Sequence, residues 1–126
     1  MLVEDLKMGL AKSYRELQIW QSSIVLCKSI YELTSSFPKE EMFGISNQMR
    51  RCSVSIPSNI AEGFGRTNPN FLNYLKIARG SLYELDTQLV LTRELSLTND
   101  NDTLNKLEIE IQELGKMINS FMKSLK

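Results

Sequence analysis

The chain has 126 residues, in which 15 lysines and arginines balance 15 aspartates and glutamates, and it contains no histidine. This length predicts a single domain over residues 1–126, and a hydrophobic content of 42% is enough for one core. The absence of histidine excludes catalytic triads built on imidazole, histidine-ligated zinc and the Glu-x-x-His di-iron sites of helical bundles. We therefore expect no enzymatic activity, no cofactor, no metal and no small-molecule substrate.

The sequence predicts neither a targeting signal nor a membrane-spanning segment. The first ten residues mix charged and apolar side chains, so no signal peptide is predicted, and no segment approaches the roughly 18 uncharged apolar residues of a membrane span. The protein is expected to be cytoplasmic, without a membrane partner. Cys27 and Cys52 lie in apolar helical patterns, which favours buried, reduced thiols over a disulfide. A reactive thiol is the weaker alternative, because no histidine is present to act as its base.

The first predicted helix spans about residues 13–37 and stops at Phe37-Pro38. Its apolar residues recur at spacings of three and four along two adjacent stripes. Together the stripes cover about half of the circumference, which is wider than the roughly 100° stripe of a surface helix. We therefore expect this helix to pack both within its own bundle and against another subunit. The residues predicted to form this oligomer interface are Ile19, Leu26, Ile30 and Leu33.

The second predicted helix spans about residues 44–65 and contains Pro57, which predicts a kink or a short break there. Small residues crowd the segment 53–65 and indicate a tight crossing with a neighbouring helix, after which Gly63 and Gly65 end the helix. Pro57, Asn59, Glu62 and Gly63 are interpreted as a structural motif, a kink with a satisfied polar cluster, and a ligand site is the alternative.

The third helix is predicted over about 69–97 and the fourth over about 103–125. Asn68 is the expected N-cap of the third helix and Pro69 its first helical residue. Short connections between long helices predict an all-α, antiparallel, up-down-up-down four-helix bundle. Asp100 and Asp102 resemble the start of a calcium loop, but the glycine and glutamate that such a loop requires are missing, so no calcium site is expected.

Charge is distributed unevenly along the chain. Residues 41–80 carry five basic and two acidic side chains, whereas residues 81–126 carry five and eight. The candidate phosphate-binding residues in the basic middle are Arg50, Arg51, Arg66, Lys76 and Arg79. The alternative is that these cations pair with carboxylates across the bundle or between subunits.

Four short motifs carry a family resemblance. They are Phe37-Pro38, Gln48-Met49-Arg50-Arg51, the run from Ser55 to Gly63 (SIPSNIAEG) and the run from Ala78 to Leu85 (ARGSLYEL). In this order and spacing they resemble the bacterial "four helix bundle protein" family. That family includes proteins encoded within intervening sequences of 23S ribosomal RNA genes and the accessory variability protein of diversity-generating retroelements.

The resemblance implies a four-helix protomer that assembles into a ring-shaped homopentamer with no known catalytic activity. For the retroelement relative it also implies a basic surface that engages nucleic acid and a reverse transcriptase. Two hypotheses follow for this chain. In the first, a homo-oligomeric adaptor binds RNA or DNA through its basic residues. In the second, the protein is a scaffold for protein partners, and its arginines form salt bridges between subunits.

Overall fold

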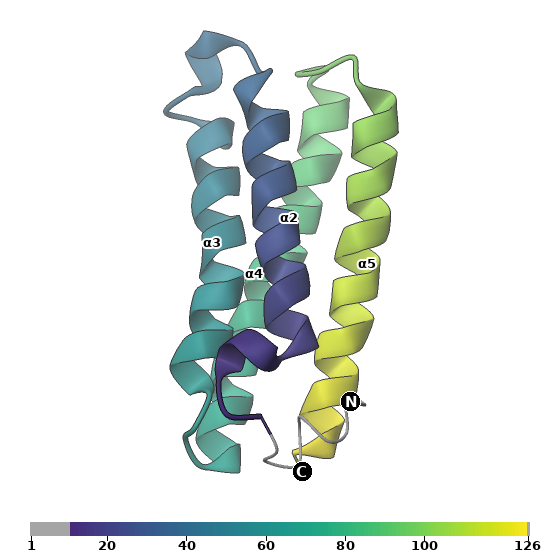
Figure 1. Ribbon diagram of the computed structural model, residues 1–126. Helices are drawn as coiled ribbons and strands as arrows, with labels where there is room; N and C mark the ends of the chain where they lie inside the picture. The colour runs from purple at the N-terminus through teal and green to yellow at the C-terminus, as the bar shows by residue number, and fades with distance from the viewer. Residues whose placement is uncertain (1–10, 126) are drawn as a thin grey trace.

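The computed structural model describes residues 11–125, which form four long α-helices and no strand. The helices are α2 (Gln18–Ser35), α3 (Ile45–Gly63), α4 (Asn68–Glu94) and α5 (Asn101–Ser124). Short 3-10 helices, η2 (Tyr14–Glu16) and η3 (Lys39–Glu41), precede α2 and α3. The predicted all-α four-helix bundle is confirmed (Figure 1). Within residues 11–125, no helix is long and apolar enough to cross a membrane.

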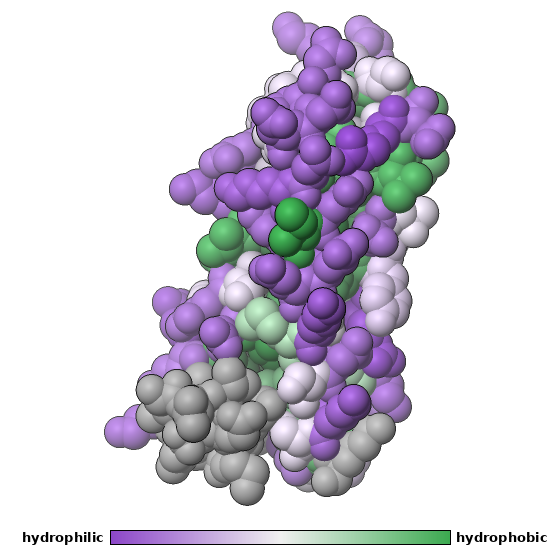
Figure 2. Space-filling model, turned by 90° about the vertical axis from the view of Figure 1, so that its right-hand side faces the viewer, coloured by the Kyte–Doolittle hydropathy of each residue, from purple (hydrophilic) through white to green (hydrophobic). Residues whose placement is uncertain are grey.

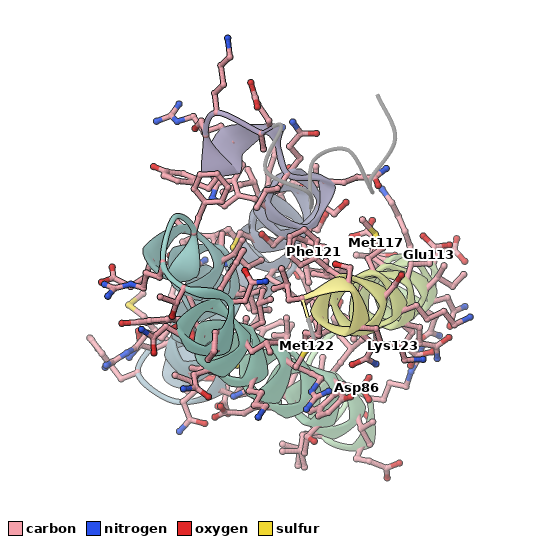
Figure 3. The ribbon with its side chains drawn as sticks, turned by 90° about the horizontal axis from the view of Figure 1, so that it is seen from below. Asp86, Glu113, Met117, Phe121, Met122 and Lys123 are labelled. Atoms are coloured by element: carbon pink, nitrogen blue, oxygen red, sulfur yellow. The ribbon has the colours of Figure 1, made fainter. Side chains whose placement is uncertain are left out.

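The four helices stand at the corners of a square, with α2 diagonally opposite α4 and α3 diagonally opposite α5 (Figures 1 and 3). Contacts between neighbouring helices pair rising residue numbers on one helix with falling numbers on the next, so neighbours run antiparallel. Between α2 and α3, Cys27 contacts Ser53 and Thr34 contacts Arg50. Between α3 and α4, Ser55 contacts Ser81 and Gly63 lies against Phe71. Between α4 and α5, Arg79 contacts Asn119 and Arg93 contacts Glu108. Because the helices form a square, the groove between α3 and α4 lies on the opposite side of the bundle from the groove between α2 and α5 (Figure 3).

The buried stripe of α2 differs from the prediction for this helix. Ile19, Leu26, Ile30 and Leu33 are only 0 to 3% exposed and belong to the core of the protomer itself. The prediction that they form an oligomer interface is wrong, because side chains already buried within one chain have almost no surface left for a second copy. On the other predicted stripe, only the middle of the helix is exposed, at Ile24 and Tyr31, whereas Thr34 near its end is buried.

Local capping places the helix ends slightly differently from the sequence prediction. Residues 13–17 are not part of α2, because Ser13 caps the 3-10 turn η2 and the α-helix begins only at Gln18. Helix α4 begins at Asn68, one residue earlier than predicted, and its N-cap is Thr67, whose hydroxyl accepts a hydrogen bond from the Asn70 amide. Pro69 lies in the first turn, where its missing N–H leaves no acceptor unsatisfied.

Helix α3 continues through Pro57 without interruption, so the predicted break is wrong, whereas a kink stays a prediction. Proline has no N–H to donate to the carbonyl four residues earlier, which is that of Ser53. The thiol of Cys27 on α2 donates to this carbonyl oxygen at an Sγ–O distance of 2.9 Å. The hydrogen bond that Pro57 removes from α3 is therefore replaced by one from the neighbouring helix.

This replacement leads to a testable coupling. The substitution Cys27→Ala should lower the free energy of unfolding by about 1 to 3 kcal/mol, because the Ser53 carbonyl loses its donor. Cys27→Ser keeps a donor and should cost less. In a Pro57→Ala background, where α3 regains its own N–H donor, the cost of Cys27→Ala should shrink. A double-mutant cycle by urea denaturation measures this, and an equal cost in both backgrounds would contradict the coupling.

The crossing of α3 and α4 is as tight as the small residues of α3 indicate. A Cβ added to Gly63 would lie 2.7 Å from Tyr74 Cβ and 2.8 Å from Phe71 Cδ1, so only glycine fits. Beyond the end of α3, Gly65 has a φ of 83°, a left-handed conformation that glycine adopts without strain. Gly63 thus sets the spacing of the two helices that form the α3/α4 groove.

Candidate nucleic-acid and subunit interfaces

The guanidinium of Arg50 lies against α2. Its Nε donates to Thr34 Oγ1 at 2.8 Å, its Nη2 donates to Ser35 Oγ at 3.1 Å, and the group stands 4.8 Å from the centre of the Tyr31 ring. All of these partners are uncharged. Arg50 is therefore held in a defined position while its positive charge is not neutralised.

Arg51 points to the other side of α3, into the α3/α4 groove. It lines a cavity of about 450 Å³ together with Ser55 and Glu84, and the ring of Phe43 lies at its edge with 90% of its surface exposed. The groove is closed at its base by a hydrogen bond of 2.7 Å between the hydroxyls of Ser55 and Ser81. Within residues 11–125, no side chain forms an ion pair or hydrogen bond with Arg51.

The remaining three predicted cations lie elsewhere. Arg66 pairs with Glu62 at 3.2 Å and stands over the Tyr74 ring at the end of α3. Arg79 donates to Asn119 Oδ1 at 2.9 Å in the α4/α5 groove. Lys76 is exposed on α4. The structure thus distributes the five predicted residues over different grooves and does not gather them into one patch on a single protomer.

The predicted motif around Pro57 makes separate local contacts along α3. Asn59 Nδ2 donates to the Ser55 carbonyl at 2.7 Å and lies 3.2 Å from Ser55 Oγ. The Glu62 carboxylate binds Arg66, and Gly63 packs against α4. The polar partners of Asn59 and Glu62 are thus Ser55 and Arg66, within α3 and just beyond its end, and the structural interpretation of this motif stays a prediction.

Both cysteines are free thiols whose pKa is raised. Burial raises the pKa of Cys27, although a hydrogen bond with the Ser53 side chain partly lowers it. Burial together with the nearby Glu84 carboxylate raises the pKa of Cys52 to about 12. Neither thiol forms an appreciable thiolate at neutral pH, which argues against a nucleophilic role. In the described part of the chain, no three cysteine or acidic side chains come close enough to hold a metal ion.

A second groove, between α2 and α5, was not identified from the sequence. It encloses a cavity of about 190 Å³ lined by residues of both helices, which are Ser22, Val25, Glu110, Glu113, Leu114 and Met117. In Figure 3, Glu113 and Met117 project from one side of α5 and Lys123 from the other. The sequence places Glu113 only in the acidic end of the chain, because it does not show which acids face a neighbouring helix.

The carboxylate of Glu110 in this groove lacks a donor. Its Oε1 lies 3.9 Å from the exposed Lys106 ammonium, while its Oε2 is buried without a hydrogen-bond partner among the described residues. Burial raises the pKa of Glu110, and the neighbouring Glu113 adds to this while Lys106 opposes it. The face around α5 is largely hydrophilic and carries isolated hydrophobic side chains (Figure 2).

Fold and surface together define an all-α bundle protein whose described residues form cavities between α3 and α4 and between α2 and α5. The profile of the 23S rRNA-intervening sequence proteins matches residues 15–120. The chain therefore belongs to the 23S rRNA-intervening sequence protein family.

One solved structure with the same fold comes from Bacteroides thetaiotaomicron and is described as a protein of unknown function from the S23 ribosomal protein family. It is 23% identical in sequence, with a TM-score of 0.75, and the match covers 83% of this chain and 95% of the other. At this identity the likeness concerns the fold alone. A search of curated proteins finds no match.

Proposed function

We propose that this protein is a non-enzymatic adaptor that assembles as a homopentamer and binds the phosphate backbone of RNA or DNA. The observation that carries the proposal is the uncompensated positive charge of α3 and α4. Arg50 and Arg79 are fixed by uncharged partners only, so each presents a full charge in a defined position. Repeating these cations around a ring would turn weak single contacts into useful affinity.

The proposal is tested by binding of fluorescent single-stranded RNA and double-stranded DNA at about 50 to 200 mM salt. Affinity should fall steeply with salt, and Arg50→Ala with Arg79→Ala should weaken all sequences alike. Arg66→Ala is the matched control, because Glu62 already compensates this charge and the loss should be smaller. Affinity that does not change with salt would contradict nucleic-acid binding. Circular dichroism checks that each variant is folded.

A second candidate function is a scaffold for protein partners, whose arginines form salt bridges between subunits. The scaffold function is favoured by the positions of the five predicted cations, which lie at different places on the protomer and do not form one phosphate-binding patch. In this case, replacing Arg50 and Arg51 together by alanine should dissociate the oligomer before it affects any nucleic acid. Size-exclusion chromatography with light scattering separates the two candidates. A reverse transcriptase as the protein partner stays a prediction.

A further inference from the structure

The α2/α5 groove contains an acceptor that a second molecule can satisfy. The Glu110 side chain is 23% exposed, and its Oε2 atom is buried with no donor in the described chain. A buried acceptor without a donor costs free energy, and a charged one costs more. The Lys106 ammonium, at 3.9 Å from the other oxygen and 74% exposed, compensates this charge only weakly.

The chemistry of the cavity beside Glu110 selects the kind of group that fits. Val25, Leu114 and Met117 form apolar walls, and Glu110 with Glu113 supplies negative charge. A long basic side chain is complementary to this cavity, because its methylene stem packs on apolar walls while its charged end reaches carboxylates. Arginine fits best, because its planar fork can donate to two acceptors at once.

The opposite side of the bundle presents such a side chain. Arg51 lies at the α3/α4 groove without an ion-pair partner among residues 11–125. On the same stripe of α4, Ile77 and Leu91 stand seven residues before and after Glu84 and are both exposed. One face of the protomer thus offers Arg51 in a mostly polar groove, with exposed apolar residues of α4 on either side of Glu84. The opposite face offers two carboxylates beside apolar groups, with Val25 58% exposed.

From this complementarity we infer that Arg51 of one protomer inserts between α2 and α5 of a second copy and binds Glu110 and Glu113. The contact joins two different faces that lie on opposite sides of the bundle. It is therefore heterologous, and its repetition closes a ring when the rotation between copies allows it. The inference rests on the homo-oligomeric part of the proposed function and assigns Arg51 to the subunit contact instead of to a nucleic-acid surface.

Charge reversal tests the contact. Arg51→Glu and Glu113→Arg should each raise the dissociation constant of the subunits at least about tenfold, because like charges then face each other. The matched controls are Lys123→Glu and Asp86→Arg, which reverse exposed charges outside both grooves and should leave assembly unchanged. Light scattering after size exclusion gives the mass of each variant over a dilution series.

Mixing the two reversed variants distinguishes a contact between copies from an effect within one chain. Each variant alone should dissociate, whereas together they should associate, because Glu at position 51 of one then meets Arg at position 113 of the other. In a ring of five, one contact between identical variants remains, so the mixture should form open assemblies or weaker rings. A chain that carries both reversals should also assemble. Failure of both the mixture and the double variant to associate would overturn the inference.

Glu110→Gln keeps the protomer testable if reversal disturbs folding. The neutral amide removes a buried charge, so the protomer should remain folded while the subunit contact weakens. The outcomes separate the two proposals. A wild-type protein that is monomeric overturns homo-oligomerisation and this inference with it. A wild-type oligomer that persists in Arg51→Glu, Glu113→Arg and Glu110→Gln overturns the assigned contact alone.

Discussion

Replacing Gly63 with alanine is expected to destabilise the protomer by about 1 to 3 kcal/mol or more. The added Cβ would overlap Tyr74 Cβ and Phe71 Cδ1, and the first of these atoms cannot move without its backbone. Helices α3 and α4 would have to separate, which would also strain the hydrogen bond between Ser55 and Ser81 at the base of their groove.

Gly80 provides the matched control for this experiment. It lies within α4, and nothing stands within 4 Å of the Cβ that alanine would add. Gly80→Ala should therefore stabilise the protein by about 0.5 to 1 kcal/mol through helix propensity. Urea denaturation at one fixed protein concentration measures both substitutions. Equal effects at Gly63 and Gly80 would show that the crossing is not as close as described.

Ile30→Ala should produce the largest loss, about 2 to 5 kcal/mol, because it leaves a cavity in the centre of the bundle. Ile30 is fully buried within one chain, whereas Ile24 on the same helix is 41% exposed. Ile24→Ala should change the stability of the protomer by no more than about 0.5 kcal/mol. The pair compares the same residue type on two faces of α2.

Thermal or urea unfolding monitored by circular dichroism measures this contrast at a protein concentration low enough to separate subunits. If Ile30→Ala left the protomer as stable as before and only dissociated an oligomer, the assignment of Ile30 to the protomer core would fail. Light scattering on the same samples reports the oligomeric state.

The fold was predictable because long apolar repeats and strong stop signals leave few alternatives. Pro38, the Gly63 to Gly65 segment and the capped turn before Thr103 divide the chain into helices, and the structure has helix ends at or close to these places. The rotation of α2 about its own axis, which sets the face it buries, could not be predicted in the same way. Two adjacent apolar stripes are equally compatible with burial, and only the positions of α3 and α5 decide which one faces inward.

The same limit applies to the candidate sites. The sequence shows that residues 41–80 are basic, but it does not show that Arg50 turns to α2 while Arg51 turns to α4. These residues are neighbours in the chain and stand about 100° apart on a helix, so they enter different grooves. Glu110 and Glu113 become a site only because α2 passes beside α5.

The sequence alone determined the family, the all-α class, the tight crossing at Gly63 and the absence of imidazole chemistry, since each depends on residue type and local spacing. The tertiary structure decided which stripe of α2 forms the core, how the carbonyl opposite Pro57 finds a donor in Cys27, and where the charges stand. These properties depend on which faces of separate helices meet, and packing across the bundle sets that arrangement.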